Sequence, residues 1–260
     1  MPGLLSRPAA IASEARWNQK EYFRNPAAAA FTFAFPLMFL VIFTALNGNN
    51  TVPIPGGHVK YAQYYVPAII SFGVISACYT NLAFNLSISR ENGILKRMRG
   101  TPLKASTYLA GLVVHVIVVS IILTALTTVL GLVAYGVTFP GRYLALAVAI
   151  ALEAFAFSAL GVAVSTFVPN EDAAPAIINF LLFPLLFISG TFYPVRAGST
   201  LANIANVFPV RHGLTLMVGA FNPRIHGYGI TVKDVGMLLL WGVIGIAVAV
   251  RRFRWEPSHR

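Results

Sequence analysis

The chain alternates long apolar runs with short polar connections, and the length of the runs decides the fold class. A helix rises about 1.5 Å per residue, so a run of about 20 apolar residues crosses a hydrocarbon layer of about 30 Å. Six such runs occupy roughly half of the sequence. The pattern predicts an all-α integral membrane protein with six transmembrane helices, at 27–46, 65–88, 107–136, 143–168, 175–193 and 235–250.

Two of the remaining segments also carry helical patterns, within what we treat as one membrane domain over residues 1–260. The arm 1–26 mixes aromatic and basic residues, which predicts an N-terminal amphipathic helix in the headgroup layer, although a solvated basic arm has a similar composition. The segment 195–233 contains an apolar stretch interrupted by Asn, Pro, Arg and His. It favours short re-entrant or interfacial helices between the fifth and sixth spans over a seventh span.

The charges agree with a membrane location and give it an orientation. Only 10% of the 260 residues are charged, against about 25% in soluble domains, which excludes an ordinary soluble enzyme. The net charge of +11 does not indicate nucleic-acid binding, because the basic residues flank the apolar runs. The arm, the connection 89–104 and the tail 251–260 hold 13 of the 19 Lys and Arg residues. The positive-inside rule therefore predicts that both termini are cytoplasmic.

Motifs for covalent or nucleotide chemistry are missing. Cys78 is the single cysteine and the five histidines are scattered, so we expect no metal site. The chain has no phosphate-binding loop, zinc pair or nucleophile elbow, so we expect no catalytic residue and no bound cofactor. The cytoplasmic segments are also too short to hold an ATPase domain.

The connection 89–104 carries the strongest signal. It reads SRENGILKRMRGTPLK, with an apolar side (Ile94, Leu95, Met98) and a basic side (Lys96, Arg97, Arg99). This amphipathicity suits a helix that lies across the membrane face and docks to a partner. Thr101-Pro102 ends it, since proline disfavours helical geometry in the preceding residue. The alternative is a charged loop that only fixes the topology.

Here the sequence resembles a known family. The run 90–103, RENGILKRMRGTPL, is similar to the R-E-x-G-(T/I)-L-x-R-(L/M)-(R/L)-x-T-P-L signature of type 2 ABC exporter (ABC-2) permeases, which lies between the second and third spans of that family. The end of the fifth span, 181–195, and FPVRH at 208–212 also resemble the family. The likeness covers nearly the whole chain in span count and order. Asn92 departs from it, because many relatives carry a second acidic residue there.

The resemblance implies a function. Such a chain is the permease half of an ATP-driven exporter in the cell's inner membrane, paired with a second permease copy or a related permease. Two separate ATPase subunits bind ATP and Mg²⁺. The pattern is closest to drug, antibiotic-resistance and lipid exporters, which implies an amphipathic cargo. The amino-terminal helix also touches the ATPase in such proteins, and 89–104 is the coupling helix, with the matching positions Arg90, Glu91, Gly93, Leu95, Lys96, Arg97, Thr101 and Pro102.

Polar residues inside the spans are candidates for a substrate path, which would run near the dimer axis in similar exporters. Asn residues recur along one face of the second span, and an Asn-Phe stripe follows the fifth, although helix–helix bonding and packing explain such stripes equally well. Glu153 is the one acid deep in a span; it could attract a cation, or stay neutral and hydrogen-bond a neighbour, and His115 lies at the wrong depth to pair with it. The candidates are Asn81, Asn85, Glu153, Asn179, Phe183 and Phe187.

Three other functions compete with drug or lipid export. Within the same family, the cargo could be a polysaccharide or a lipid-linked glycan, against which the phenylalanine-rich fifth span argues modestly. A secondary transporter or channel would show an inverted repeat, and the sequence contains none that we detect. A membrane enzyme would require a convergent catalytic set, for which Glu153 alone is too little.

Overall fold

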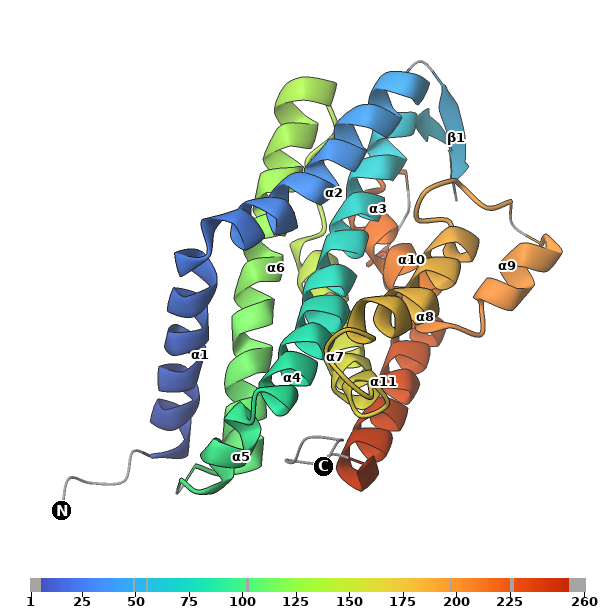
Figure 1. Ribbon diagram of the computed structural model, residues 1–260. Coiled ribbons are helices and arrows are strands. Elements are labelled where there is room, and N and C mark those ends of the chain that lie inside the picture. The colour runs from blue at the N-terminus through green and yellow to red at the C-terminus, as the bar shows by residue number, and fades with distance from the viewer. Residues whose placement is uncertain are drawn as a thin grey trace.

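The computed structural model describes residues 6–48, 50–54, 56–101, 103–196, 198–224 and 227–252, without the side chains of Ala28 and Arg99. It is an elongated bundle of helices with a small β-hairpin at one end (Figure 1). The elements are α1 (Arg7–Arg24), α2 (Pro26–Asn47), β1 (Thr51–Ile54), β2 (Gly57–Lys60), α3 (Tyr61–Ile75), the π-helical η1 (Ser76–Asn81), α4 (Leu82–Glu91), α5 (Ile94–Arg99), α6 (Ala105–Tyr135), α7 (Tyr143–Ser165), α8 (Ala174–Ser189), α9 (Thr200–Ala205), α10 (Pro209–Phe221) and α11 (Val232–Arg252).

A helix occupies each of the six predicted spans, but one of them is shorter than predicted. In the described part of the chain, five helices are long and apolar enough to cross a membrane: Ala29–Asn47 of α2, Tyr61–Glu91, α6, α7 and α11. The predicted span 175–193 is α8, whose 16 residues cover only about 24 Å, because Gly190 with φ +99° ends the helix. The structure therefore supports a multi-pass helical membrane protein, and its described residues hold five helices of full spanning length and the shorter apolar α8.

The second span forms the centre of the bundle. It runs through α3, η1 and α4 as one helix of 31 residues, and 83% of its most apolar window is buried, against 22% for α2 and 28% for α11. The wider π turn of η1 holds Cys78 and Asn81, two of the polar positions that the sequence places on one face. A span enclosed in this way meets neighbouring helices rather than lipid on most of its surface.

The connection between α2 and α3 holds a small β-hairpin that the sequence pattern did not predict, within a fold that is otherwise helical in the described residues. It forms the antiparallel strands β1 and β2, with Thr51 opposite Lys60 and Ile54 opposite Gly57. Val52 and Val59 face the bundle and are buried, while their neighbours along the strands are largely exposed. The alternation covers four residues in each strand, which is too short to stand out beside the long apolar runs.

The amino-terminal arm is helical, as predicted, but α1 runs beside α6 rather than across the bundle (Figure 1). Contacts recur along the first turns of α6, where Arg7 meets Ser106, Glu14 meets Gly111, and Gln19 meets His115. Burial raises the pKa of the Glu14 carboxyl above its usual range. The 31 residues of α6 span about 46 Å, about 16 Å more than a hydrocarbon core, so α1 packs along the length that the core does not need.

The segment between α8 and α11 contains two short helices, as predicted. α9 has 6 residues and α10 has 13, so neither is a seventh span. Most of α10 is buried, and it packs against α7 and α3. His212 and Asn222 are therefore enclosed by protein, whereas Asn203 of α9 is exposed, and the predicted re-entrant depth of the segment in the membrane stays a prediction.

Candidate functional site

The predicted coupling segment forms a short helix between two turns at one end of the bundle. α4 ends at Glu91, and Gly93 adopts φ +66°, a left-handed conformation that lets the chain reverse into the six residues of α5. After α5, the Thr101 hydroxyl donates to the Met98 carbonyl at 2.7 Å and accepts from Leu103 N at 3.3 Å. Thr101 thus stabilises the turn by hydrogen bonds, whereas Pro102 lies outside the described residues.

One side of α5 is anchored and the other is exposed. Leu95 is 1% exposed and belongs to an apolar cluster with residues of α4, α6, α7 and α11, against which Met98 also packs. Lys96 and Arg97 are exposed, as the sequence pattern predicts for the basic side. Ile94 departs from that pattern, because it lies on the exposed side at 38%. The outer surface of α5 therefore combines two cations with an apolar side chain.

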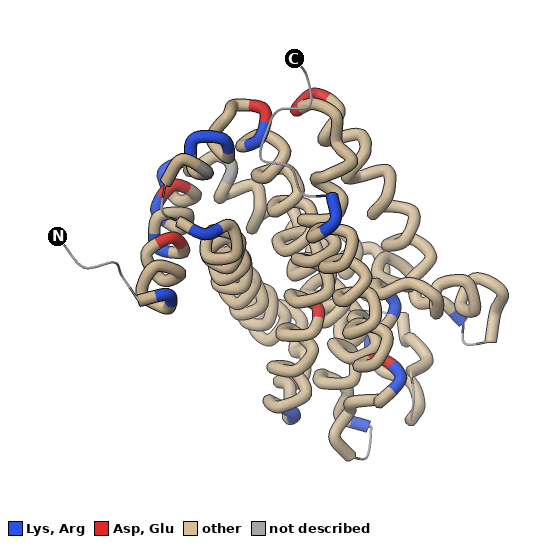
Figure 2. Tube along the Cα trace, turned by 90° about the horizontal axis from the view of Figure 1, so that it is seen from below, with Lys and Arg blue, Asp and Glu red and all other residues tan. Residues whose placement is uncertain are grey.

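Charges near α5 lack acidic partners. In the described ranges, Lys96 and Arg97 form no ion pair, and the single polar contact of the Arg97 side chain is a 3.5 Å hydrogen bond to the Asn92 carbonyl. Figure 2, seen from the α5 end, shows Lys and Arg gathered mainly beside the amino-terminal helix and α5, while most of the bundle carries neither sign of charge. An acidic surface would therefore be electrostatically complementary to this end of the bundle.

Arg90 points in the opposite direction to Lys96 and Arg97. Its side chain is 5% exposed and donates from Nη1 to the Ser165 carbonyl at 2.9 Å and from Nη2 to the Val168 carbonyl. Carbonyls at a helix carboxyl end have no partner within the helix and attract positive charge. Arg90 therefore joins the end of α4 to the end of α7. Beside it, Glu91 is half-buried, and its Oε2 has no hydrogen-bond partner in the described part of the structure.

The predicted substrate-path residues, Glu153 apart, lie on neighbouring helices, because α4 and α8 are in contact. Asn85 is exposed and accepts a hydrogen bond from Ser89 at 3.3 Å, and Phe183 and Phe187 are 39% and 57% exposed. Asn81 and Asn179 are half-buried. Asn85 of α4 and the two phenylalanines of α8 therefore form an exposed amide and aromatic surface, while Asn81 of η1 and Asn179 are partly covered.

Glu153 lies apart from that surface, inside the bundle. It is fully buried where α3, α7 and α10 meet, and Oε1 accepts a 2.7 Å hydrogen bond from the Ser71 hydroxyl. Gly213 of α10 packs against the carboxyl group so closely that a Cβ there would lie 2.4 Å from Oε1. Oε2 has no partner among the described residues. His115 contacts Gln19 instead. This agrees with the prediction that His115 and Glu153 lie at different depths and do not pair.

A buried polar cluster near α10 was missed by the sequence reasoning. His212 Nδ1 lies 2.5 Å from Asp234 Oδ1, and Nε2 lies 2.9 Å from the Asn206 carbonyl. The Thr231 hydroxyl donates to the same aspartate, and Arg211 donates to the Ser189 carbonyl at 2.8 Å. These bonds tie α10 to the start of α11 and to the end of α8. The partners stand 22 residues apart in the chain, so no local spacing reveals them.

Comparison with known proteins places these features in a family context. The sequence model of the family described as "ABC-2 type transporter" matches residues 12–222, which include α5 and α10. The inner membrane transport permease YadH of Escherichia coli strain K12 is 25% identical over 226 residues, covering 86% of this chain and 84% of that protein. The proteins of the same name in Escherichia coli O157:H7 and Shigella flexneri match with the same identity and coverage.

Proposed function

The chain belongs to the ABC-2 type transporter family, and on this premise we propose that it is the permease subunit of an ATP-driven exporter. Members of this family work with ATPase partners. The proposed complex contains two permeases, as a homodimer or with a related permease, and two separate ATPase subunits that bind ATP and Mg²⁺. The observation that carries the proposal is α5, which is anchored by Leu95 and presents Lys96 and Arg97 outward.

The outer surface of α5 has the make-up of a small docking site. Ile94 supplies an apolar contact, and the two flanking cations would pair with carboxylates of the ATPase. The buried side of α5 would transmit movement of the docked helix to the rest of the bundle. Movement of α5 would reach α4 and α6 through Leu95, and α7 through Arg90. Closure of the ATPase subunits would thereby switch the side of the membrane to which the cargo site opens.

The uncovered surface on α4 and α8 supports a cargo path beside the second permease. Phe180, Phe183 and Phe187 expose large aromatic faces, while Asn85 adds an amide. This mixture suits an amphipathic cargo such as a drug, an antibiotic or a lipid, taken from the cytoplasm or the inner leaflet. Glu153 is buried among α3, α7 and α10, apart from this surface, and would influence a cargo there only indirectly.

The proposed membrane arrangement keeps six crossings, with α8 as the fifth. Its 16 residues would cross with the help of the apolar residues that follow, including Phe192, which packs on Phe39 of α2. Six crossings place both termini on the cytoplasmic side together with α5, in agreement with the distribution of Lys and Arg. In the same arrangement, residues 1–26 form a cytoplasmic arm, 89–104 form the coupling segment, and 195–233 form the outer segment between the fifth and sixth spans.

Charge reversal on α5 tests the proposal. We would co-express the chain with an ATPase subunit encoded beside it and compare wild type with Lys96→Glu/Arg97→Glu, using Arg196→Glu, an exposed site in the α8–α9 connection, as the matched control. The double variant should lose co-purification and cargo-stimulated ATP hydrolysis, while the control keeps both. Normal association and transport in the double variant would overturn the docking role. Stimulation by a lipid-linked glycan alone would redirect the cargo to polysaccharide export.

A further inference from the structure

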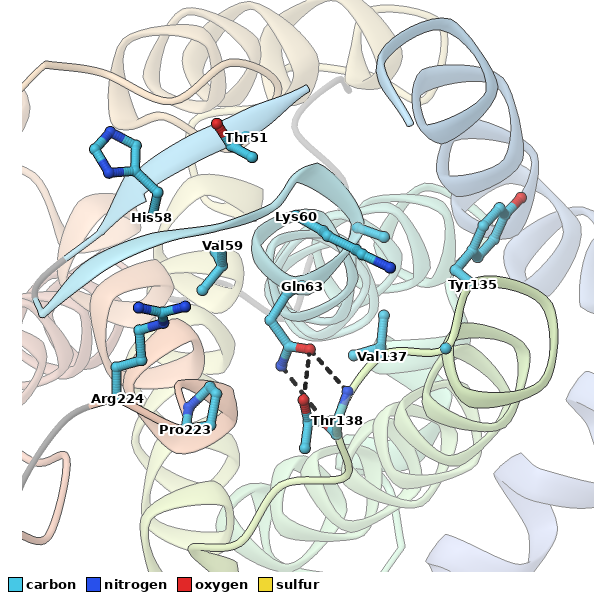
Figure 3. Close-up of a pocket in the computed structure, with 12 residues that line it drawn as sticks. Thr51, His58, Val59, Lys60, Gln63, Tyr135, Val137, Thr138, Pro223 and Arg224 are labelled. Atoms are coloured by element: carbon cyan, nitrogen blue, oxygen red, sulfur yellow. Dashed lines mark hydrogen bonds between the residues drawn. The ribbon is translucent and has the colours of Figure 1, made fainter. Parts of the chain in front are cut away.

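A pocket of about 410 Å³ lies at the end of the bundle opposite α5. The β-hairpin, the start of α3, the connection between α6 and α7, and the turn after α10 enclose it (Figure 3). The polar side chains in its lining are Thr51, His58, Lys60, Gln63, Tyr135, Thr138 and Arg224. Its volume falls within the range of small-molecule sites, roughly 300–1,000 Å³.

The floor of the pocket is fixed by hydrogen bonds. Gln63 Oε1 accepts from the backbone N and the hydroxyl of Thr138, at 2.7 and 3.1 Å, and its Nε2 donates to the Phe221 carbonyl at 2.8 Å (Figure 3 shows the bonds to Thr138). Arg142 donates to the Asn222 and Gly227 carbonyls at 2.5 and 2.8 Å, which ties down the connection after α10. The pocket therefore lies between elements that these hydrogen bonds hold in place.

The hairpin turn positions one of the pocket cations. Gly56 and Gly57 have φ of +92° and +134°, and a Cβ on Gly57 would lie 3.1 Å from Arg224 Nη1. The backbone N of Arg224 donates to Asn222 Oδ1 at 2.9 Å, which holds the turn that carries the side chain. Glycine is required at this turn both for its conformation and for the close approach of the guanidinium group.

The lining is positively charged and has no counter-charge. It contains Lys60, Arg224 and His58 but no carboxylate, and neither Lys60 nor Arg224 forms an ion pair within the described residues. Asp234, an acid near this end of the bundle, is buried and bonded to His212. Unpaired cations around a concavity attract an anion, because low-dielectric walls focus their field.

The pocket also lies at the ends of two candidate membrane spans. It joins the first turn of α3 to the last turn of α6, which are the ends of two predicted spans. Phe139 and Tyr228, on connections at this end, and Tyr143, the first residue of α7, are 51%, 80% and 66% exposed. Exposed aromatic residues at the ends of spans mark the boundary between hydrocarbon and water.

We propose that this pocket binds the phosphate group of an anionic lipid headgroup on the outer side of the membrane. Arg224 would present its planar donor fork to two phosphate oxygens, and Lys60 would add a point charge. A water-soluble phosphate ester shares this chemistry, so the test must separate the two sources. The proposal does not depend on ATP-driven export, because it concerns equilibrium binding to the permease alone.

The test measures binding to the full chain, purified in a neutral detergent, by titration calorimetry. The probes are dioctanoyl phosphatidylglycerol, net-neutral dioctanoyl phosphatidylcholine, and glycerol 3-phosphate. The variant is Lys60→Gln/Arg224→Gln, and the matched control is Lys233→Gln, an exposed cation at the start of α11 that does not line the pocket. We expect each pocket cation to contribute roughly fivefold, so the double variant should bind phosphatidylglycerol roughly 25-fold more weakly.

The outcomes separate the sources of phosphate. Binding of phosphatidylglycerol alone, lost in the double variant and kept in the control, supports the lipid site. Binding of glycerol 3-phosphate with the same loss supports a phosphate site filled from solution. Equal affinity in wild type and double variant overturns the proposal, and so does an equal loss in the control. Because the substituted cations are exposed, all variants should elute as wild type in size-exclusion chromatography.

Discussion

Arg90 offers the most direct test of how the coupling segment is held to the bundle. The change Arg90→Ala removes two hydrogen bonds from a charged donor to the Ser165 and Val168 carbonyls. Hydrogen bonds that involve a charged group contribute about 1.5–3 kcal/mol each. Ser165 and Val168 are 2% and 1% exposed, so water would reach the released carbonyls only through the space that the shortened side chain leaves, and would offset part of the loss. We expect the contact between α4 and α7 to weaken by about 3 kcal/mol.

This loss should appear as local opening. A change of about 3 kcal/mol corresponds to a roughly 150-fold larger open population, which amide hydrogen exchange measures directly. In the purified full chain, peptides covering 89–101 and 160–168 should exchange faster, while those from the centre of α3 stay protected. The closest control in the same segment is Arg97→Ala, since its side chain is exposed and makes one 3.5 Å hydrogen bond.

The control should change exchange by about twofold or less, because exposed substitutions stay within about 0.5 kcal/mol. Equal protection of 89–101 in the two variants would refute the role assigned to Arg90. Faster exchange along the whole chain would refute it too, since that result would mean global destabilisation rather than release of one end of α4.

Two further substitutions test other parts of the site. Gly93→Ala forces a Cβ into the left-handed conformation at φ +66° and should destabilise the turn into α5 by about 1–2 kcal/mol, seen as faster exchange around 92–95. Gly236→Ala, in α11 with open space around it, is the control and should leave exchange around 92–95 unchanged. Equal exchange of 92–95 in the two variants would contradict the need for glycine at position 93. Glu153→Gln keeps the hydrogen-bond acceptor for the neighbouring hydroxyl, so the thermal midpoint and the transport of each cargo tested should stay close to wild type. A selective loss of cationic cargo would instead show that Glu153 contacts the substrate.

The long helices could be predicted because an apolar run of this length in lipid must satisfy its backbone N–H and C=O groups internally, which a helix does. α7 begins at the predicted residue 143 and ends three residues before the predicted 168. The end of α8 could not be predicted in the same way. The sequence remains apolar through FISGTFYPV, and the helix stops where Gly190 takes a positive φ, which hydrophobicity does not encode.

The exposed side of the coupling segment could be predicted from the sequence, and its buried side only in part. Lys96 and Arg97 follow from helical periodicity, as does the burial of Leu95. Arg90 was predicted only as one of the coupling positions that the family resemblance implies, and nothing in the sequence indicated that its side chain is buried. Its acceptors are backbone carbonyls 75 and 78 residues away, and a carbonyl has no residue type by which a sequence could reveal it.

The two anchors of this segment both involve α4 and α7, and this limits how α5 can move. Leu95 shares a cluster with residues of α4, α6, α7 and α11, while Arg90 fixes the end of α4 to the end of α7. Packed clusters of this kind switch between discrete arrangements rather than deform continuously. A docked partner that displaces α5 must therefore either move all four helices or break the Arg90 contacts. Only a partner that binds the displaced arrangement more tightly can favour it, so in the proposed complex the difference in ATPase binding free energy between the two arrangements would have to exceed the local stability that Arg90 provides.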